Sequence, residues 1–161
     1  MPKVAIEEAP LRTGSGYPAP FAAMMEGRSS RRLAQAAGLT QFGANLVILQ
    51  PGAVASLRHA HEKEDELAWV VEGELVLVED AGETLLRAGD CAAWPAGTGD
   101  AHRFENRSGA EARFLVVGPS DPDEVVTYPD VGMVLHREGG ANRLTHLDGT
   151  PWAGPRQGAA E

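Results

Sequence analysis

Short apolar stretches dominate the middle of the chain. From Gln41 onward they are continuous or alternate with polar residues, and Gly, Pro and Asp separate them. This pattern predicts antiparallel strands joined by hairpins, with strong turns at Glu72-Gly73 and Ala81-Gly82. The predicted strands cover residues 42–49, 54–59, 67–71, 75–78, 84–87, 91–94, 102–105, 112–117 and 132–136. So many strands at short spacing, with almost no helix between them, predict an all-β sandwich or barrel.

The two ends of the chain lack this pattern. Proline and glycine interrupt residues 1–27, which predicts an extended arm. A short helix is expected next, over residues 31–37, capped by Ser29 or Ser30 and stopped by Gly38. Gly, Pro and Ala are frequent again near the C-terminus. We therefore expect an arm with a short helix over residues 1–40, one barrel over residues 41–138 and a tail over residues 139–161.

Size and charge narrow the range of functions. A chain of 161 residues, 43% hydrophobic and 23% charged, has the length and composition of one globular domain. Its 14 basic and 23 acidic residues give a net charge of -9, which opposes attraction to phosphate backbones. No helix-turn-helix pattern precedes the predicted barrel. We therefore expect no nucleic acid among the partners.

The number of cysteines and the hydropathy of the chain indicate where in the cell the protein is expected. Cys91 is the single cysteine, so an intramolecular disulfide is impossible, which fits a reducing cytoplasm. We expect Cys91 to be a small buried residue, because no motif pairs it with a base. The first residues lack the apolar core of a signal peptide, and no apolar run approaches the roughly 18 residues of a membrane span. The sequence predicts a cytoplasmic protein with no membrane partner.

Histidine and glutamate occur at spacings that favour a metal site. Residues two apart on a strand face the same side, so His59 and His61 can direct both imidazoles to one point. Glu66 opens the next apolar run after a polar turn and can return its carboxylate beside them. His102 begins another strand and can supply a third imidazole. Glu64 could replace Glu66 as a ligand if the turn folds differently.

Two motifs resemble the signatures of the cupin superfamily. The first is Gly52 followed by His59-x-His61-x4-Glu66-x6-Gly73, and the second is Gly89-x5-Pro95-x-Gly97-x4-His102-x3-Asn106. Gly52 lies one residue farther from His59 than in the common pattern, and Gly97 lies two farther from His102. Both extensions fall near turns, where insertions are tolerated. Segments 125–130 and 145–152 also resemble a branch of small, single-domain bacterial cupins.

The resemblance implies both a fold and a site. It implies a double-stranded β-helix, or jelly-roll barrel, and a metal bound by His59, His61, Glu66 and His102. Three imidazoles with one carboxylate and no thiolate suit Fe(II), Mn(II), Ni(II), Zn(II) or Cu(II), and the sequence does not choose among them. His136 and His146 match no motif, so we expect structural or surface roles for them.

A site of this kind is compatible with two classes of function. The first is a metal-dependent enzyme of the oxygenase or isomerase type, acting on a small polar substrate such as a sugar derivative or a carboxylate. The second is a noncatalytic module that binds or senses a small ligand, because the motifs occur in both classes and include no obvious general base.

Strand parity makes two further predictions. Counting by twos from Glu66 turns Trp69 away from the site, whereas Phe104 shares the parity of His102 and is expected to line the pocket. The outward Trp69 and the proline-rich arm together predict a homodimer, in which the arm covers a neighbour's sheet edge. The alternative is that the arm folds back over its own barrel.

Overall fold

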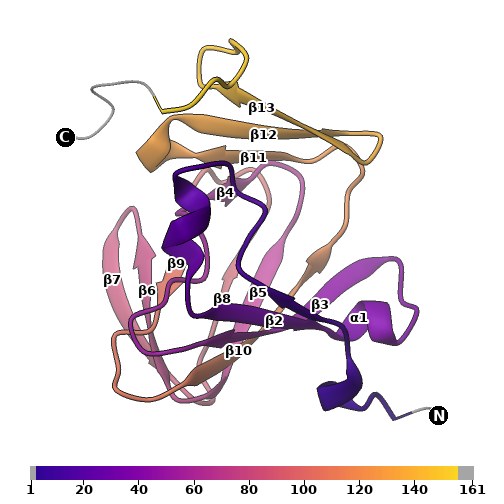
Figure 1. Cartoon of the computed structure of the whole chain (residues 1–161), viewed down its shortest axis with the longest axis vertical. Coiled ribbons are helices and arrows are strands. Elements are labelled where there is room, and N and C mark those ends of the chain that lie inside the picture. Colours follow the sequence, from indigo (N-terminus) through magenta and orange to yellow (C-terminus); the bar gives the residue numbers. More distant parts are fainter. Residues whose placement is uncertain (1–2, 156–161) are drawn as a thin grey trace.

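The computed structural model describes residues 3–155, and it is almost entirely β-structure (Figure 1). The largest sheet has the strand order β1-β2-β3-β10-β5-β8. Its strands are β1 (Leu11–Thr13), β2 (Arg28–Arg32), β3 (Phe42–Leu49), β5 (Glu66–Glu72), β8 (Cys91–Trp94) and β10 (Ala112–Pro119). The predicted all-β jelly-roll class is confirmed, because the pairings in this sheet are antiparallel and join strands distant in sequence.

Two smaller sheets complete the barrel. One has the order β7-β6-β9 and consists of β6 (Glu74–Glu79), β7 (Gly82–Arg87) and β9 (Arg103–Glu105). The other has the order β13-β12-β11-β4 and consists of β4 (Ala60–His61), β11 (Val125–Tyr128), β12 (Met133–Glu138) and β13 (Ala141–His146). Figure 1 shows β11, β12 and β13 lying across one end of the molecule. No helix among residues 3–155 is long and apolar enough to cross a membrane.

The N-terminal segment is more ordered than an extended arm. Strand β2 pairs with β3 along its whole length, and β1 pairs with β2, so this segment extends its own barrel's sheet. The helix α1 (Leu33–Ala36) is shorter than expected and has no side-chain cap. Ser29 and Ser30, expected to cap it, lie inside β2, and Ser30 is buried opposite Val47. Pairing with β3 satisfies their backbone and outweighs the local capping preference.

The C-terminal segment also differs from the expected tail. Strand β13 pairs residue by residue with β12, from Met133 opposite His146 to Glu138 opposite Ala141. Gly139 and Gly140 form the turn between them with φ values of 58° and 84°, which favour glycine. The small sheet therefore continues through residue 146.

Two apolar clusters form the core. The main cluster fills the barrel and includes Leu49, Val70, Leu75, Phe104 and Phe114. The second lies beneath β11 and β12, and it receives Phe21 and Met25 from the short helix η2 (Phe21–Met25) of the N-terminal segment. The N-terminal segment therefore contributes to the core at one end and to the large sheet at the other.

The outer face of β5 agrees with the parity argument, whereas Cys91 does not behave as expected. Trp69 is 48% exposed, as the alternation of β5 predicted. Cys91 was expected to be buried, but it is exposed. It lies directly opposite Trp69 on β8, on the same outward face, while the inward positions of β8 are taken by Ala92, which packs against the core, and Trp94, which is 7% exposed. Strand parity therefore places Cys91 outside the core.

A single glycine next to the candidate site allows a close backbone approach. A Cβ added to Gly118 would lie 2.6 Å from the carbonyl oxygen of Asp65, the residue that precedes Glu66. We expect Gly118→Ala to lower the free energy of unfolding by about 1–3 kcal/mol, because the backbone must shift to relieve the overlap. Denaturant unfolding will measure this. Gly109→Ala is the control, since a Cβ there meets nothing within 4 Å, and equal losses for the two variants would contradict the prediction.

Candidate metal centre

The three motif histidines come from two chain segments that a β-bridge holds together. His59 and His102 exchange backbone hydrogen bonds of 3.0 and 2.9 Å. His61 follows on β4, which pairs with β11. The ring centroid of His59 lies 5.0 Å from that of His61 and 4.9 Å from that of His102. Backbone pairing therefore fixes the imidazoles as one cluster.

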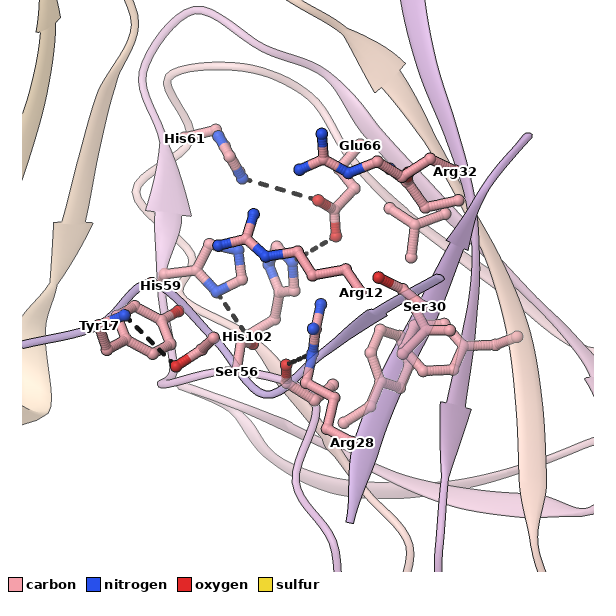
Figure 2. Close-up of a pocket in the computed structure, with 18 residues that line it drawn as sticks. Arg12, Tyr17, Arg28, Ser30, Arg32, Ser56, His59, His61, Glu66 and His102 are labelled. Carbon is pink, nitrogen blue, oxygen red and sulfur yellow. Dashed lines mark hydrogen bonds and ion pairs between the residues drawn. The ribbon is translucent and has the colours of Figure 1, made fainter. Parts of the chain in front are cut away.

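Glu66, the first residue of β5, brings a carboxylate to the same cluster. Its Oε1 lies 3.0 Å from His102 Nε2, and its Oε2 lies 3.6 Å from His61 Nε2 (Figure 2). One ligand atom each from His59, His61 and Glu66 all lie within 4.8 Å of one another, a spacing that could hold a metal ion. His102 joins this group through its contact with Glu66. All four residues singled out from the sequence line one cavity.

The protonation states suit metal binding. His59 Nδ1 lies 2.9 Å from the carbonyl oxygen of Leu57, so this nitrogen carries the proton and Nε2 keeps its lone pair. Burial lowers the pKa of His59 to about 4, so the ring is neutral at pH 7. Burial alone would raise the pKa of Glu66, but the hydrogen bond from His102 and the neighbouring imidazoles outweigh it and lower this pKa to about 2. The cluster thus offers a neutral imidazole at His59 and an ionised carboxylate at Glu66.

Trp94 fixes the plane of His102 and was not identified from the sequence. The two rings are stacked, with centroids 3.7 Å apart and an interplanar angle of 10°. Trp94 Nε1 in turn donates a 2.8 Å hydrogen bond to Glu79. One feature of the sequence could have drawn attention to Trp94: it ends a predicted strand immediately before the Pro95 turn of the second motif. Its contact with His102 depends on how the chain folds back between β8 and His102, which spacing does not give.

Glu124 is a second residue near the cluster that the sequence does not identify. Its carboxylate is fully buried and accepts backbone N–H groups from Glu62, Lys63 and Val125 at 2.7–3.2 Å. These bonds hold the connection between His61 and Glu66. The local sequence around Glu124 shows no pattern that distinguishes it from the other acidic residues near it.

Glu64, the alternative ligand, faces elsewhere. Its Oε1 accepts hydrogen bonds from the Asp121 N–H at 2.7 Å and from Arg137 at 3.0 Å, while its Oε2 lies 3.6 Å from His61 Nδ1. His61, Glu64 and Glu124 also have ligand atoms within 4.8 Å of one another. Both carboxylates of that second group already accept protein donors, however, and neither lines the cavity of the first.

The cluster lies on a cavity of about 340 Å³. Phe104 contributes to its wall, as strand parity predicted, together with Phe114 and Val47 from the barrel core. Its polar lining includes Tyr17, Ser30, Ser56 and three arginines, Arg12, Arg28 and Arg32. Figure 2 shows the arginines and the histidine–glutamate cluster around the same space. The volume is in the range of small-molecule sites.

The remaining histidines are outside this cavity. His136 Nε2 lies 3.0 Å from Thr145 Oγ1, and His146 packs on Trp152 with ring centroids 4.7 Å apart. Both lie in the β12–β13 hairpin. The structural roles expected for them agree with these contacts.

The residues present fit a divalent transition metal. The donor set is three imidazoles and a carboxylate, a mixed nitrogen and oxygen set. His61 Nδ1 and His102 Nδ1 are buried without a hydrogen-bond partner among the described residues, so both atoms remain available as ligands. His59 has the outer hydrogen bond to a carbonyl that metal-ligating histidines commonly make.

Comparisons with known proteins agree with the fold and the motifs. A family model described as a cupin domain matches residues 45–118. A crystal structure of a sugar phosphate isomerase from a cupin superfamily, from Silicibacter pomeroyi, is 48% identical, with 94% of this chain and 97% of that chain covered and a TM-score of 0.91. This chain belongs to the cupin superfamily. No match was found among curated proteins.

More distant cupins share the architecture. The polyketide cyclase RemF from Streptomyces resistomycificus is 26% identical over 75% of this cupin and 80% of its own chain, with a TM-score of 0.61. A structure from Acidithiobacillus ferrooxidans, 24% identical over 86% of this cupin and 96% of its own chain, has a TM-score of 0.73 and shows the common fold alone. The superfamily therefore fixes the fold and leaves the reaction to be argued from the site.

Proposed function

We propose that this cupin is a metal-dependent isomerase of a small sugar derivative, with His59, His61, Glu66 and His102 as the ligands of a divalent transition metal. The observation that carries the proposal is the cluster of three imidazoles and an ionised carboxylate on a cavity of about 340 Å³. The 48% identical protein described as a sugar phosphate isomerase supports the choice of reaction. Fe, Mn, Ni, Zn and Cu all suit the donor set.

The protein's own side chains supply binding and orientation. A divalent ion held by the cluster would polarise a substrate carbonyl as a Lewis acid. Ser30, Asn45 and Ser56 line the cavity and offer hydrogen-bonding groups to sugar hydroxyls. Burial raises the pKa of the Tyr17 phenol, which therefore keeps its proton at neutral pH and can donate a hydrogen bond to a substrate oxygen. Phe104 and Phe114 exclude water from one wall.

One feature of the cavity favours a second candidate, a noncatalytic module that binds or senses a small ligand. Among the described residues that line the cavity, Glu66 is the only carboxylate. An isomerase that transfers a proton between adjacent carbons needs a general base. If Glu66 binds the metal, the described lining of the cavity has no second carboxylate for this role, and a ligand-binding module needs none.

The two candidates differ in turnover. Protein purified without chelator will be assayed by proton NMR in deuterated water against aldoses, ketoses and their phosphates. An isomerase is expected to interconvert an aldose and a ketose, and chelation should abolish this interconversion; deuterium at the carbon next to the carbonyl would identify proton transfer. Ligand-induced thermal stabilisation without interconversion of any sugar would overturn the isomerase in favour of the binding module. Substrate-dependent oxygen consumption would identify an oxygenase.

We also infer a homodimer formed through the outer face of β5. Leu67, Trp69 and Val71 alternate on this strand and are 44%, 48% and 50% exposed, so they form an apolar surface next to one another. Trp69→Lys is expected to convert a dimer at micromolar concentration into a monomer in sedimentation velocity. Leu147→Lys is the control, because Leu147 is 62% exposed outside this surface. A monomeric wild type would contradict the inference.

A further inference from the structure

The arginines of this protein divide into two groups. Eight of the eleven that the structure describes lie within 4.0 Å of a carboxylate: Arg31, Arg58, Arg87, Arg103, Arg107, Arg113, Arg137 and Arg143. The three without such a partner among residues 3–155 are Arg12, Arg28 and Arg32, and all three line the cavity of the metal cluster. In a chain with a net charge of -9, unpaired cations confined to one cavity indicate an anionic ligand there.

Strand geometry explains why these arginines converge. Arg28, Ser30 and Arg32 alternate along β2, so their side chains share one face. Arg12 on β1 is paired directly opposite Ser30, which places it on that face between the other two. Strand β3, which pairs with β2, adds Asn45 and Val47 to the same wall of the cavity. The arginines are thus held by a sheet that is anchored to the barrel.

The three guanidinium groups are not equivalent. Arg28 donates from Nε to the Ala55 carbonyl at 2.6 Å and from Nη1 to the Gly14 carbonyl at 2.9 Å, which orients it and leaves Nη2 without a recorded partner. Arg12 and Arg32 have no recorded hydrogen bond from their guanidinium groups among the described residues. Figure 2 shows both extending toward the histidine–glutamate cluster. Arg28 is therefore prepositioned, and the other two are available to close on a ligand.

We propose that Arg12, Arg28 and Arg32 form the binding site for the phosphate group of the substrate. This inference rests on the proposed function, since it assigns the charged end of the sugar derivative whose carbonyl faces the metal cluster. Three guanidinium groups against the single carboxylate of Glu66 leave an excess of positive charge in the cavity. A phosphate monoester carries up to two negative charges and three terminal oxygens, which match several guanidinium donors approaching from different strands.

The chemistry favours phosphate over a carboxylate. One guanidinium fork satisfies both oxygens of a planar carboxylate, and two further arginines would then remain unpaired. Burial lowers the pKa of Arg28, and the charge of Arg12 lowers it further, so bringing these two groups together has a cost that a multiply charged anion offsets. The arginines lie outside residues 45–118, which match the cupin domain. The N-terminal segment thus supplies substrate selectivity to a metal site built by the barrel.

Calorimetric titration of inorganic phosphate into metal-free protein at fixed ionic strength tests the proposal without activity. Removing the metal ensures that phosphate has no ion to bind. The wild type is expected to bind phosphate saturably, and the double variant Arg12→Gln/Arg32→Gln is expected to lose about tenfold or more in affinity. These two guanidinium groups make no hydrogen bond or ion pair within residues 3–155, so the double variant is expected to fold, and circular dichroism will check this. Arg143→Gln, which removes an exposed ion pair with Glu138, is expected to leave affinity unchanged.

The outcomes separate this inference from the proposed function. Absence of saturable phosphate binding by the wild type, equal affinity in the double variant, or equal binding of acetate would overturn the phosphate site. Phosphate binding that depends on the arginines, without isomerisation of any sugar, would sink the isomerase and leave the anion site standing. If the protein isomerises a neutral sugar and its phosphate with equal kcat/KM, and the double variant leaves both values unchanged, the phosphate site is wrong and the isomerase stands.

Discussion

Glu66→Gln is expected to lower the affinity for a divalent transition metal by more than about 100-fold. Loss of a partner outside the ligand set commonly costs about 10- to 100-fold, and Glu66 is the only anion in the cluster. Glutamine has nearly the same shape and can still accept the hydrogen bond from His102, so the metal-free variant is expected to fold. Competition titration with a chromophoric chelator will give the affinities, and circular dichroism will check the fold.

Glu64→Gln is the matched control for this variant. Glu64 lies in the same turn but accepts hydrogen bonds from Arg137 and the Asp121 N–H, and it does not line the cavity. Its replacement is expected to change metal affinity little. The reverse result, with Glu64→Gln the more damaging substitution, would mean that the turn presents the other carboxylate to the metal.

Phe114→Ala is expected to lower the free energy of unfolding by about 3–5 kcal/mol. Phe114 is 1% exposed in the middle of β10 and packs on Phe104 with ring centroids 4.7 Å apart. Removing its ring opens a void between the core and the cavity, which the paired strands β3 and β5 on either side cannot close. For a chain of this size the loss corresponds to a melting temperature lower by roughly 10 °C.

Phe42→Ala provides a matched substitution on the same sheet. Phe42 begins β3 and is 39% exposed, so its ring gains little from burial. A loss of less than about 1 kcal/mol is expected. Similar losses for the two phenylalanines would show that the main core does not extend along β10 as described.

The barrel strands and the shared face of His59 and His61 were predictable from the sequence because both depend on short-range rules. Alternation and turn residues predicted most strands between Phe42 and Val117. The spacing of His59 and His61 fixes a common face once the segment is extended. Glu66 and His102 required the resemblance to cupins, since nothing local shows that β5 and the second motif meet at the same point.

The N-terminal segment was misjudged for a physical reason. Strand β2 reads Arg-Ser-Ser-Arg-Arg, and its inward face points into a polar cavity. Hydrophobic alternation cannot reveal a strand whose buried face is charged. The unpaired arginines therefore became visible only when the pairing of β1, β2 and β3 was known. Cys91 shows the converse error, because a residue type that is often buried lies on the outward face of β8.

Anomalous X-ray diffraction from metal-loaded crystals tests the metal centre most directly. One anomalous peak per chain is expected, about 2.0–2.2 Å from nitrogen atoms of His59, His61 and His102 and from a carboxylate oxygen of Glu66. Collecting on both sides of each metal's absorption edge identifies the element. A peak coordinated by Glu64 and Glu124, or no peak at the His59–Glu66 cluster in metal-loaded crystals, would show that these four residues do not form the metal centre.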